Sequence, residues 1–158
     1  SVCFASFWEI FMASILVLNG PNLNLLGRRE PHLYGTMTLD DIEQRVRTQA
    51  NASRVAIDWL QTNHEGVMID HIHSVLDQPP SGIIINPGAW THSSVAIRDA
   101  LSAIECPFVE VHLTNIHSRE PFRAHSYFSD QALAVIAGCG AFGYEFAMIT
   151  LLANLNQG

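Results

Sequence analysis

The chain has 158 residues, 48% of them hydrophobic, and a formal net charge of -7, which is typical of a folded domain with an apolar core and excludes a disordered chain. Eight basic residues stand against fifteen acidic ones, so nothing predicts the basic surface of a nucleic-acid-binding protein. All eight are arginine. A chain without lysine cannot form a Schiff base with a carbonyl substrate, hold pyridoxal phosphate covalently or complete a Walker A loop.

The first thirteen residues are apolar and aromatic, but they lack the positive charge that opens a secretory signal. A Met-Ala-Ser stretch resembling a natural start begins at Met12, so we expect residues 1–13 to be an extension, either upstream sequence or added. No apolar run reaches the roughly 18 residues needed to span a bilayer. The three cysteines, Cys3, Cys106 and Cys139, have no CxxC spacing and favour a reducing compartment. We therefore expect a cytoplasmic protein without a membrane segment.

Short β-branched runs alternate with amphipathic stretches along the rest of the chain. Strands are predicted at residues 15–18, 55–60, 82–85, 108–113 and 133–137. Several of these runs are apolar throughout, which is typical of parallel strands that are buried on both faces.

Helix signals lie between the strands. Thr38, followed by two aspartates, predicts the start of the first helix. Asn63 is predicted to cap the second helix, which a Pro-Pro pair ends. We expect the inner face of that second helix to consist of Val67, Ile69, Ile72, Val75 and Leu76. A third helix is expected over residues 93–104. A last one, over 142–156, is largely apolar and is expected to be buried or at a subunit contact.

This alternation predicts an α/β fold, a flavodoxin-like doubly wound sandwich. We expect one five-stranded parallel sheet in the order 2-1-3-4-5 with helices on both faces. In such sheets, ligands bind beyond the carboxyl ends of the strands. The residues that follow three of the predicted strands are polar: 19–22, 86–88 with 91–94, and 112–115. Each loop alone could be an ordinary turn, but together they predict a binding crevice.

The loop after the first strand, residues 19–37, is long enough to predict a functional lid. It contains Arg28 and Arg29 near Tyr34. A guanidinium group favours tyrosinate over tyrosine, and a tyrosine needs such help to act as a base at neutral pH. The alternative is a solvated surface loop that Tyr34 anchors by its ring.

Glu110 and His112 lie two residues apart on a predicted strand, so their side chains share one face. An imidazole that is oriented by a carboxylate is suited to act as a general acid. The two side chains could equally form a structural ion pair. Arg119 and Arg123 would share a helical face if their segment is helical. They could clamp a carboxylate or pair with surface acids such as Glu120.

Two further patterns carry less weight. Residues 138–143 match GxGxxG, but no later strand could carry a ribose-binding acid. His71 and His73 point to different faces of a predicted helix and lack further ligands at zinc-site spacing. A binding module for a flavin or a nucleotide in the same crevice remains the alternative to an enzyme.

The polar loops carry three long motifs in chain order: residues 15–31 with Tyr34 and Gly35, residues 86–89 with 91–94, and residues 110–115 with Arg119 and Glu120. Together they resemble the type II 3-dehydroquinate dehydratases over residues 14–156. The resemblance implies a single catalytic domain over residues 14–158. The unrelated class of dehydroquinate dehydratase works through a lysine imine, which a chain without lysine cannot form.

The resemblance implies that water is removed from 3-dehydroquinate to give 3-dehydroshikimate, in the shikimate or quinate pathway. The elimination is anti and passes through an enolate, with no cofactor and no metal. Tyr34 would be the base that takes the C2 proton, and Arg29 its electrostatic activator. His112, oriented by Glu110, would protonate the departing C1 hydroxyl, and Asn22 would position a water at the enolate oxygen.

The resemblance also implies substrate contacts from Asn86, His92, Leu113, Thr114 and Arg123. Members of the family are expected to be homo-oligomers, dodecamers built as tetramers of trimers. Asp99 would reach the site of a neighbouring subunit in such an assembly.

Overall fold

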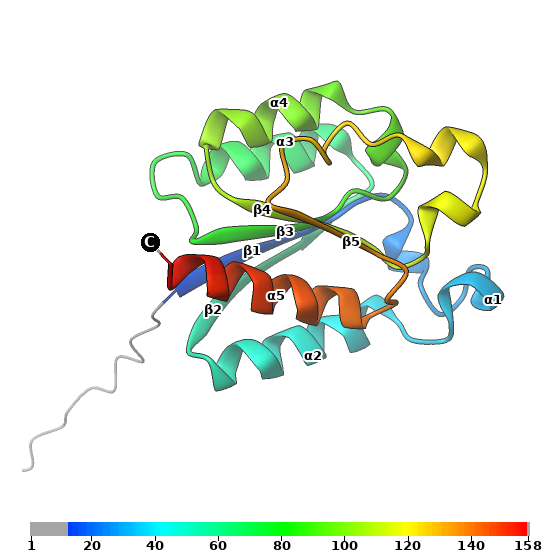
Figure 1. Ribbon diagram of the computed structural model, residues 1–158, viewed down its shortest axis with the longest axis horizontal. Helices are drawn as coiled ribbons and strands as arrows, with labels where there is room; N and C mark the ends of the chain where they lie inside the picture. Colours follow the sequence, from blue (N-terminus) through cyan, green and yellow to red (C-terminus); the bar gives the residue numbers. More distant parts are fainter. Residues whose placement is uncertain (1–12, 158) are drawn as a thin grey trace, which may run out of the picture.

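A computed structural model describes residues 13–157 of the chain (Figure 1). Five strands form one parallel sheet in the order β2-β1-β3-β4-β5. The strands are β1 (Ala13–Asn19), β2 (Val55–Gln61), β3 (Gly82–Asn86), β4 (Phe108–His112) and β5 (Ala134–Ala137). The predicted α/β fold and strand order are confirmed. Residues 1–12 of the expected extension lie outside the described part of the chain, and Ala13 opens β1 opposite Val55.

Helices cover both faces of the sheet. The α-helices are α1 (Pro31–Tyr34), α2 (Leu39–Ala52), α3 (Glu65–Ser74), α4 (Val95–Ile104) and α5 (Phe142–Leu155). Four short 3-10 helices are η1 (Leu23–Leu25), η2 (Gly88–His92), η3 (Ile116–Ser118) and η4 (Pro121–Ala124). Figure 1 shows α3 and α4 on one face of the sheet and α2 and α5 on the other. None of the helices within residues 13–157 is long and apolar enough to cross a bilayer.

The alternation of side chains along the central strands explains this arrangement. In β1, Ile15 and Val17 pack into the core under α2 and α5, whereas Leu16 and Leu18 pack into the core under α3 and α4. All four are at most 1% exposed. A strand with two dry faces must be apolar at every position, and a sheet of such strands needs helices on both sides.

The helix α2 begins as predicted. Thr38 is the N-cap, and its hydroxyl accepts a hydrogen bond from the Asp41 amide at 3.1 Å. The Asp41 carboxylate accepts one from the Thr38 amide at 2.9 Å. This reciprocal capping box satisfies two backbone donors that the first turn leaves free.

The prediction for α3 is wrong in two respects. Asn63 does not cap the helix: α3 begins at Glu65 after His64, and the Asn63 carboxamide oxygen instead accepts from the backbone of Asn22. The buried positions are Met68 and Ile72. Of the five residues expected on the inner face, Val67 is 47% exposed and Leu76 is 53% exposed. Two of the five, Val75 and Leu76, lie beyond Ser74, the last residue of the helix, so the observed helix is shorter than the predicted one.

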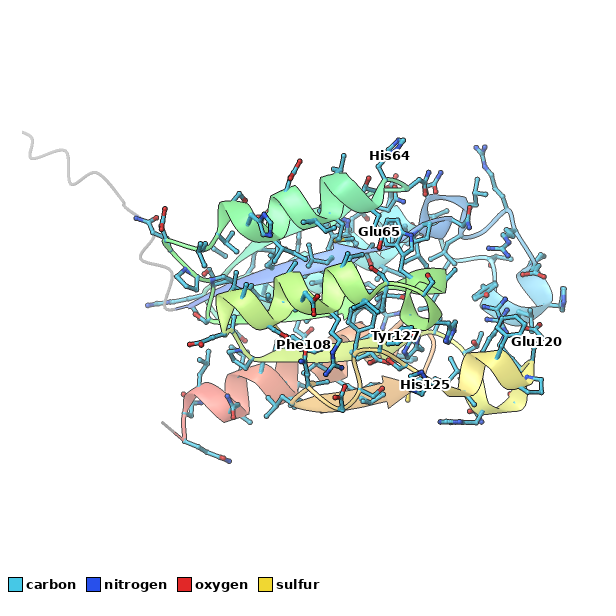
Figure 2. The ribbon with its side chains drawn as sticks, turned by 90° about the horizontal axis from the view of Figure 1, so that it is seen from above. His64, Glu65, Phe108, Glu120, His125 and Tyr127 are labelled. Atoms are coloured by element: carbon cyan, nitrogen blue, oxygen red, sulfur yellow. The ribbon has the colours of Figure 1, made fainter. Side chains whose placement is uncertain are left out.

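Other boundaries differ by one or two residues. The helix α4 begins at Val95 after a capping Ser94, and β4 ends at His112. The helix α5 has the predicted range but two apolar faces. Tyr144, Met148 and Leu151 are buried, whereas Phe142, Phe146 and Ile149 are 45–58% exposed. Between η4 and β5 the chain passes beside α4, where Figure 2 shows Tyr127.

Candidate functional site

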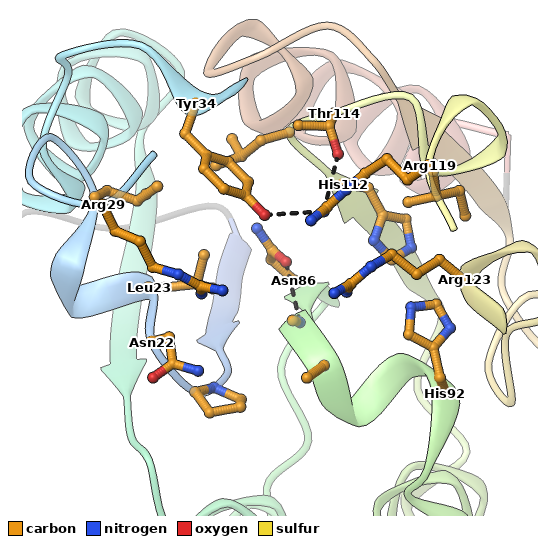
Figure 3. A pocket seen from close by; sticks show the side chains of 16 residues that line it. Asn22, Leu23, Arg29, Tyr34, Asn86, His92, His112, Thr114, Arg119 and Arg123 are labelled. Carbon is orange, nitrogen blue, oxygen red and sulfur yellow. Dashed lines mark hydrogen bonds between the residues drawn. The ribbon is translucent and has the colours of Figure 1, made fainter. Parts of the chain in front are cut away.

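A pocket lies at the carboxyl ends of β1, β3 and β4, where the doubly wound topology predicts one. The lid, the β3 loop and the segment after β4 all contribute to it (Figure 3). The residues that line it are Pro21, Asn22, Leu23, Leu26, Arg29, Tyr34, Asn86, Gly88, Ala89, His92, His112, Leu113, Thr114, Ile116, Arg119 and Arg123.

Two of the strand-end loops meet in close contact. The Gly20 amide donates to the carbonyl of Asn86 at 2.8 Å. A Cβ atom at Gly20 would lie 2.2 Å from the carbonyl oxygen of Pro87, so only glycine allows this approach. Asn22 has a left-handed backbone (φ 67°), which asparagine tolerates better than most residues, and its amide donates to Asn63 at 2.9 Å. These contacts fix the two loops that carry Asn22 and Asn86.

A buried hydrogen-bond network supports the floor of the pocket. The Tyr144 hydroxyl donates to the Asn19 carboxamide oxygen at 2.7 Å and accepts from the Asn86 side-chain nitrogen at 3.0 Å. Burial raises the pKa of Tyr144, so its hydroxyl stays protonated and remains a donor. The Asn86 oxygen accepts from the Gly88 amide at 3.2 Å. The side chain of Asn86 is therefore held at both ends.

Tyr34 is the last residue of the short helix α1, whose ends follow known preferences: Pro31 is its first residue, and Gly35, with φ 75°, follows its last. The Tyr34 hydroxyl accepts a hydrogen bond from the Arg119 guanidinium at 2.9 Å. Arg119 Cζ lies 5.5 Å from the centre of the Tyr34 ring. The phenol is thus next to a positively charged guanidinium group.

The arginine that contacts Tyr34 is not the expected one. Arg29 lines the pocket, but its Nε lies 3.6 Å from the Glu30 carboxylate. In Figure 3, Arg29 and Asn22 lie on the opposite side of the pocket from Arg119 and His112. The sequence predicts for Arg119 either a carboxylate clamp or a pairing with surface acids. Its contact with Tyr34 joins segments 85 residues apart, and no local spacing signals it.

The pairing of Glu110 with His112 is confirmed. His112 Nε2 lies 2.5 Å from a Glu110 carboxylate oxygen, and the side chains are 7% and 0% exposed. His112 lines the pocket, while Glu110 lies beneath it. Ser126 and Ser129, which sequence reasoning did not single out, donate to the same carboxylate at 2.9 and 3.0 Å.

The predicted substrate contacts lie on two further segments. His92 Nδ1 bonds the carbonyl of His125 at 2.7 Å, which leaves Nε2 for the pocket. Arg119 and Arg123 do not share one helix, because Arg119 has an extended backbone between η3 and η4. Both nevertheless line the pocket, and Arg123 pairs with Glu120. Leu113 and Thr114 line the pocket as expected.

Three other features singled out in the sequence lie outside this pocket. Asp99 is exposed on α4 and does not line the pocket of its own chain. The glycine-rich turn at residues 138–143 is also absent from that pocket. His71 pairs with Asp58 at 2.9 Å. Within residues 13–157, no group of three or more His, Cys, Asp or Glu side chains is placed to hold a metal ion.

The arrangement combines two complementary functions in one pocket. A phenol beside a guanidinium can accept a proton once ionised. An imidazole held by a buried carboxylate can donate one. Arg123 and His92 add donors for an anionic or hydroxylated ligand. The set can therefore accept a proton at one position of a ligand and donate a proton at another.

The chain is similar to proteins of one family. The family model described as "Dehydroquinase class II" matches residues 13–152. A "Catabolic 3-dehydroquinase 2" of Aspergillus flavus is 57% identical over 91% of this chain and 95% of its own length. A "3-dehydroquinate dehydratase" of Chromobacterium violaceum is 57% identical over 90% of this chain and 92% of its own length.

Solved structures agree with these sequence matches. The type II dehydroquinase of Butyrivibrio crossotus is 40% identical, with a TM-score of 0.86 over 89% of this chain and 97% of that one. The type II dehydroquinase of Propionibacterium acnes is 44% identical, with a TM-score of 0.85 over the same shares.

Proposed function

The chain belongs to the class II dehydroquinase family, and we propose that it removes water from 3-dehydroquinate to give 3-dehydroshikimate. The observation that carries the proposal is the hydrogen bond from Arg119 to the Tyr34 hydroxyl, in a pocket that His112 also lines. A weakly acidic C–H next to a ketone needs a strong base, and a poor leaving hydroxyl needs an acid. The pocket supplies candidates for both.

In the first step, the Tyr34 phenolate takes the C2 proton and the electron pair of the C–H bond moves into an enolate. The Arg119 guanidinium, 2.9 Å from the phenolic oxygen, stabilises the ionised base before the transfer. Asn22 lines the pocket and is proposed to hold a water that donates to the enolate oxygen. Arg29, also in the pocket, adds positive charge on the lid.

In the second step, the enolate re-forms the ketone, the C1–O bond breaks and His112 gives its proton to the departing hydroxyl. Glu110 holds the imidazole in position from below. The water that is lost is the C1 hydroxyl together with the proton from His112. The C2 proton stays on Tyr34 until it passes through solvent back to His112, which restores both groups. Asn86, His92, Arg123 and the backbone at Leu113 and Thr114 are proposed to bind the hydroxyl and carboxylate groups of the substrate.

A direct assay tests the proposal. The purified chain is mixed with 3-dehydroquinate, and the conjugated enone of the product is followed by its ultraviolet absorbance. We expect turnover by a colourless protein, with activity unchanged after borohydride treatment in the presence of substrate, because no lysine imine can be trapped. A yellow protein with bound flavin and no turnover would favour the binding-module alternative.

We further propose that the active form is a homo-oligomer, a dodecamer built from trimers, located in the cytoplasm. The exposed apolar stripe on α5, formed by Phe142, Phe146 and Ile149, supports burial against another subunit. Asp99, exposed on α4, is proposed to reach the site of a neighbouring subunit. Light scattering on the pure protein tests the subunit number, and a monomer would contradict it.

A further inference from the structure

The Glu110 carboxylate is fully buried and accepts hydrogen bonds from three side chains. His112 Nε2 lies 2.5 Å from Oε2. The Ser126 hydroxyl lies 2.9 Å from Oε1. The Ser129 hydroxyl lies 3.0 Å from Oε1 and 3.2 Å from Oε2. Both serines come from the loop between η4 and β5, not from the strand that carries Glu110 and His112.

The direction of the Ser126 hydrogen bond follows from its other partners. Its oxygen accepts from the amides of Phe128 at 3.0 Å and Ser129 at 3.2 Å. A hydroxyl has one proton and two lone pairs. With two donors already directed at the oxygen, the proton is left to point at Glu110 Oε1. That carboxylate oxygen therefore accepts and does not carry a proton.

Hydrogen bonds donated to a carboxylate favour its ionised form. An ionised Glu110 accepts the hydrogen bond from His112 Nε2–H across the 2.5 Å contact, and its negative charge beneath the ring favours the imidazolium, in which Nδ1 also carries a proton. If Glu110 were neutral, no negative charge would support that second proton. The two serines thus favour the ionised carboxylate on which a charged His112 depends.

The other charged groups near His112 make the ionisation of Glu110 important. Arg119 and Arg123 from the segment after β4, Arg29 from the lid, His92 from η2 and Tyr34 from α1 face the same pocket. Three guanidinium groups in one pocket disfavour a further positive charge there. An ionised carboxylate directly under His112 offsets that repulsion.

The loop that carries Ser126 and Ser129 is anchored to the rest of the fold at Tyr127, which lies between the two serines. Arg98 on α4 donates to the carbonyl of Tyr127 at 2.7 Å and forms a bidentate pair with Asp130, whose pKa it lowers. The Tyr127 amide donates to the carbonyl of Thr91 at 2.9 Å. The segment between Ser126 and Ser129 is therefore anchored on both α4 and η2, which fixes the donors that reach Glu110.

We propose that Ser126 and Ser129 are positioning residues that keep Glu110 ionised and aimed at His112, so that His112 carries the proton it delivers to the leaving hydroxyl. The catalytic part of this statement rests on the proposed dehydratase function. The placement of the proton does not, because it is a property of the free protein.

The decisive variant is Ser129→Ala. Ser126 also accepts from two backbone amides, so its loss would disturb the turn, whereas the Ser129 hydroxyl is described only in contact with Glu110. We expect kcat to fall about tenfold, part of the 10²–10⁴ that a general acid contributes, with KM within about twofold of the parent. Ser129→Thr keeps the hydroxyl and is expected to restore most of kcat. Ser74→Ala, which removes a hydroxyl bonded to a backbone carbonyl on α3, is the matched control.

A second measurement needs no substrate. The ¹⁵N shifts of the His112 ring are expected to show both nitrogens protonated in the parent and a shift toward neutral imidazole in Ser129→Ala. Parental kcat and parental ring shifts in a folded Ser129→Ala protein would overturn the proposal. So would an equal loss of kcat in Ser129→Thr. A parent that shows the imidazolium and its loss in the variant, but does not turn over 3-dehydroquinate, would contradict the dehydratase function and leave the serine assignment standing.

Discussion

The guanidinium of Arg119 lies 2.9 Å from the hydroxyl of Tyr34 and bridges the lid to the segment after β4. Tyr34 and Arg119 come from loops that the sheet order brings to the same edge. The hydrogen bond therefore ties the lid to the segment after β4 across the pocket.

Replacing Arg119 with glutamine should therefore reduce kcat. We expect a loss of about 10²-fold, the usual cost of removing one charge-stabilising donor from an active site. Arg28→Gln is the matched control, because Arg28 is exposed on the same lid and does not line the pocket. Steady-state assays with 3-dehydroquinate measure kcat for both variants. An Arg119→Gln protein as active as the Arg28→Gln protein would remove Arg119 from the mechanism.

Tyr34→Phe tests the base itself. The ring and its packing are kept, and only the oxygen that accepts the C2 proton is lost. We expect kcat to fall at least about 10²-fold with a smaller change in KM, since a base acts in the transition state more than in substrate binding. Tyr127→Phe is the control, because Tyr127 lies beside α4 and does not line the pocket. Full activity in Tyr34→Phe would require another base.

Tyr144→Phe should lower stability. The change leaves the Asn19 oxygen without its donor and the Asn86 nitrogen without its acceptor in a fully buried place. Unsatisfied buried polar groups cost about 1–3 kcal/mol each relative to their paired state. For the two groups together we expect the free energy of unfolding to fall by about 2–6 kcal/mol in urea titrations, with a raised KM because Asn86 loses one of its two supports. An unchanged urea midpoint would mean that water replaces the hydroxyl.

The two described cysteines should differ in reactivity. Burial raises the pKa of Cys106 to about 11, and its thiol faces the carbonyl of Pro80 at 3.2 Å, so at neutral pH it is neither ionised nor accessible. Cys139 is exposed. Brief iodoacetamide treatment at pH 7.5 followed by peptide mapping should find label on Cys139 and little on Cys106, while protein unfolded in urea should be labelled on both. Equal labelling of the folded protein would contradict the burial of Cys106.

The sequence predicted the fold well because the sheet is encoded in local patterns. Runs such as residues 82–85 are apolar at every position, and only a strand covered on both faces requires that. Thr38 with Asp41 predicted the start of α2 for an equally local reason. The inner face of α3 was predicted wrongly because the helix ends at Ser74, before Val75 and Leu76. Asn63 does not cap the helix because its side chain contacts the loop after β1.

Part of the site was also predicted, because part of it is encoded in local sequence patterns. Glu110 and His112 are two residues apart, so strand geometry alone brings them together. The partner of Tyr34 could not be chosen among eight arginines, because Arg119 reaches it only through the folded sheet. Ser126 and Ser129 lie in an irregular loop whose course is set by Arg98 and Thr91, and serine in a loop is too common to stand out.

The close approach of Gly20 to the carbonyl of Pro87 limits how this protein can be altered. To accommodate a bulkier ring acid, side chains could be exchanged on the lid or in the segment after β4, which line the pocket. Position 20 offers no such freedom, since even a methyl group would part the two turns that carry Asn22 and Asn86. Saturation mutagenesis of position 20 should therefore return glycine alone.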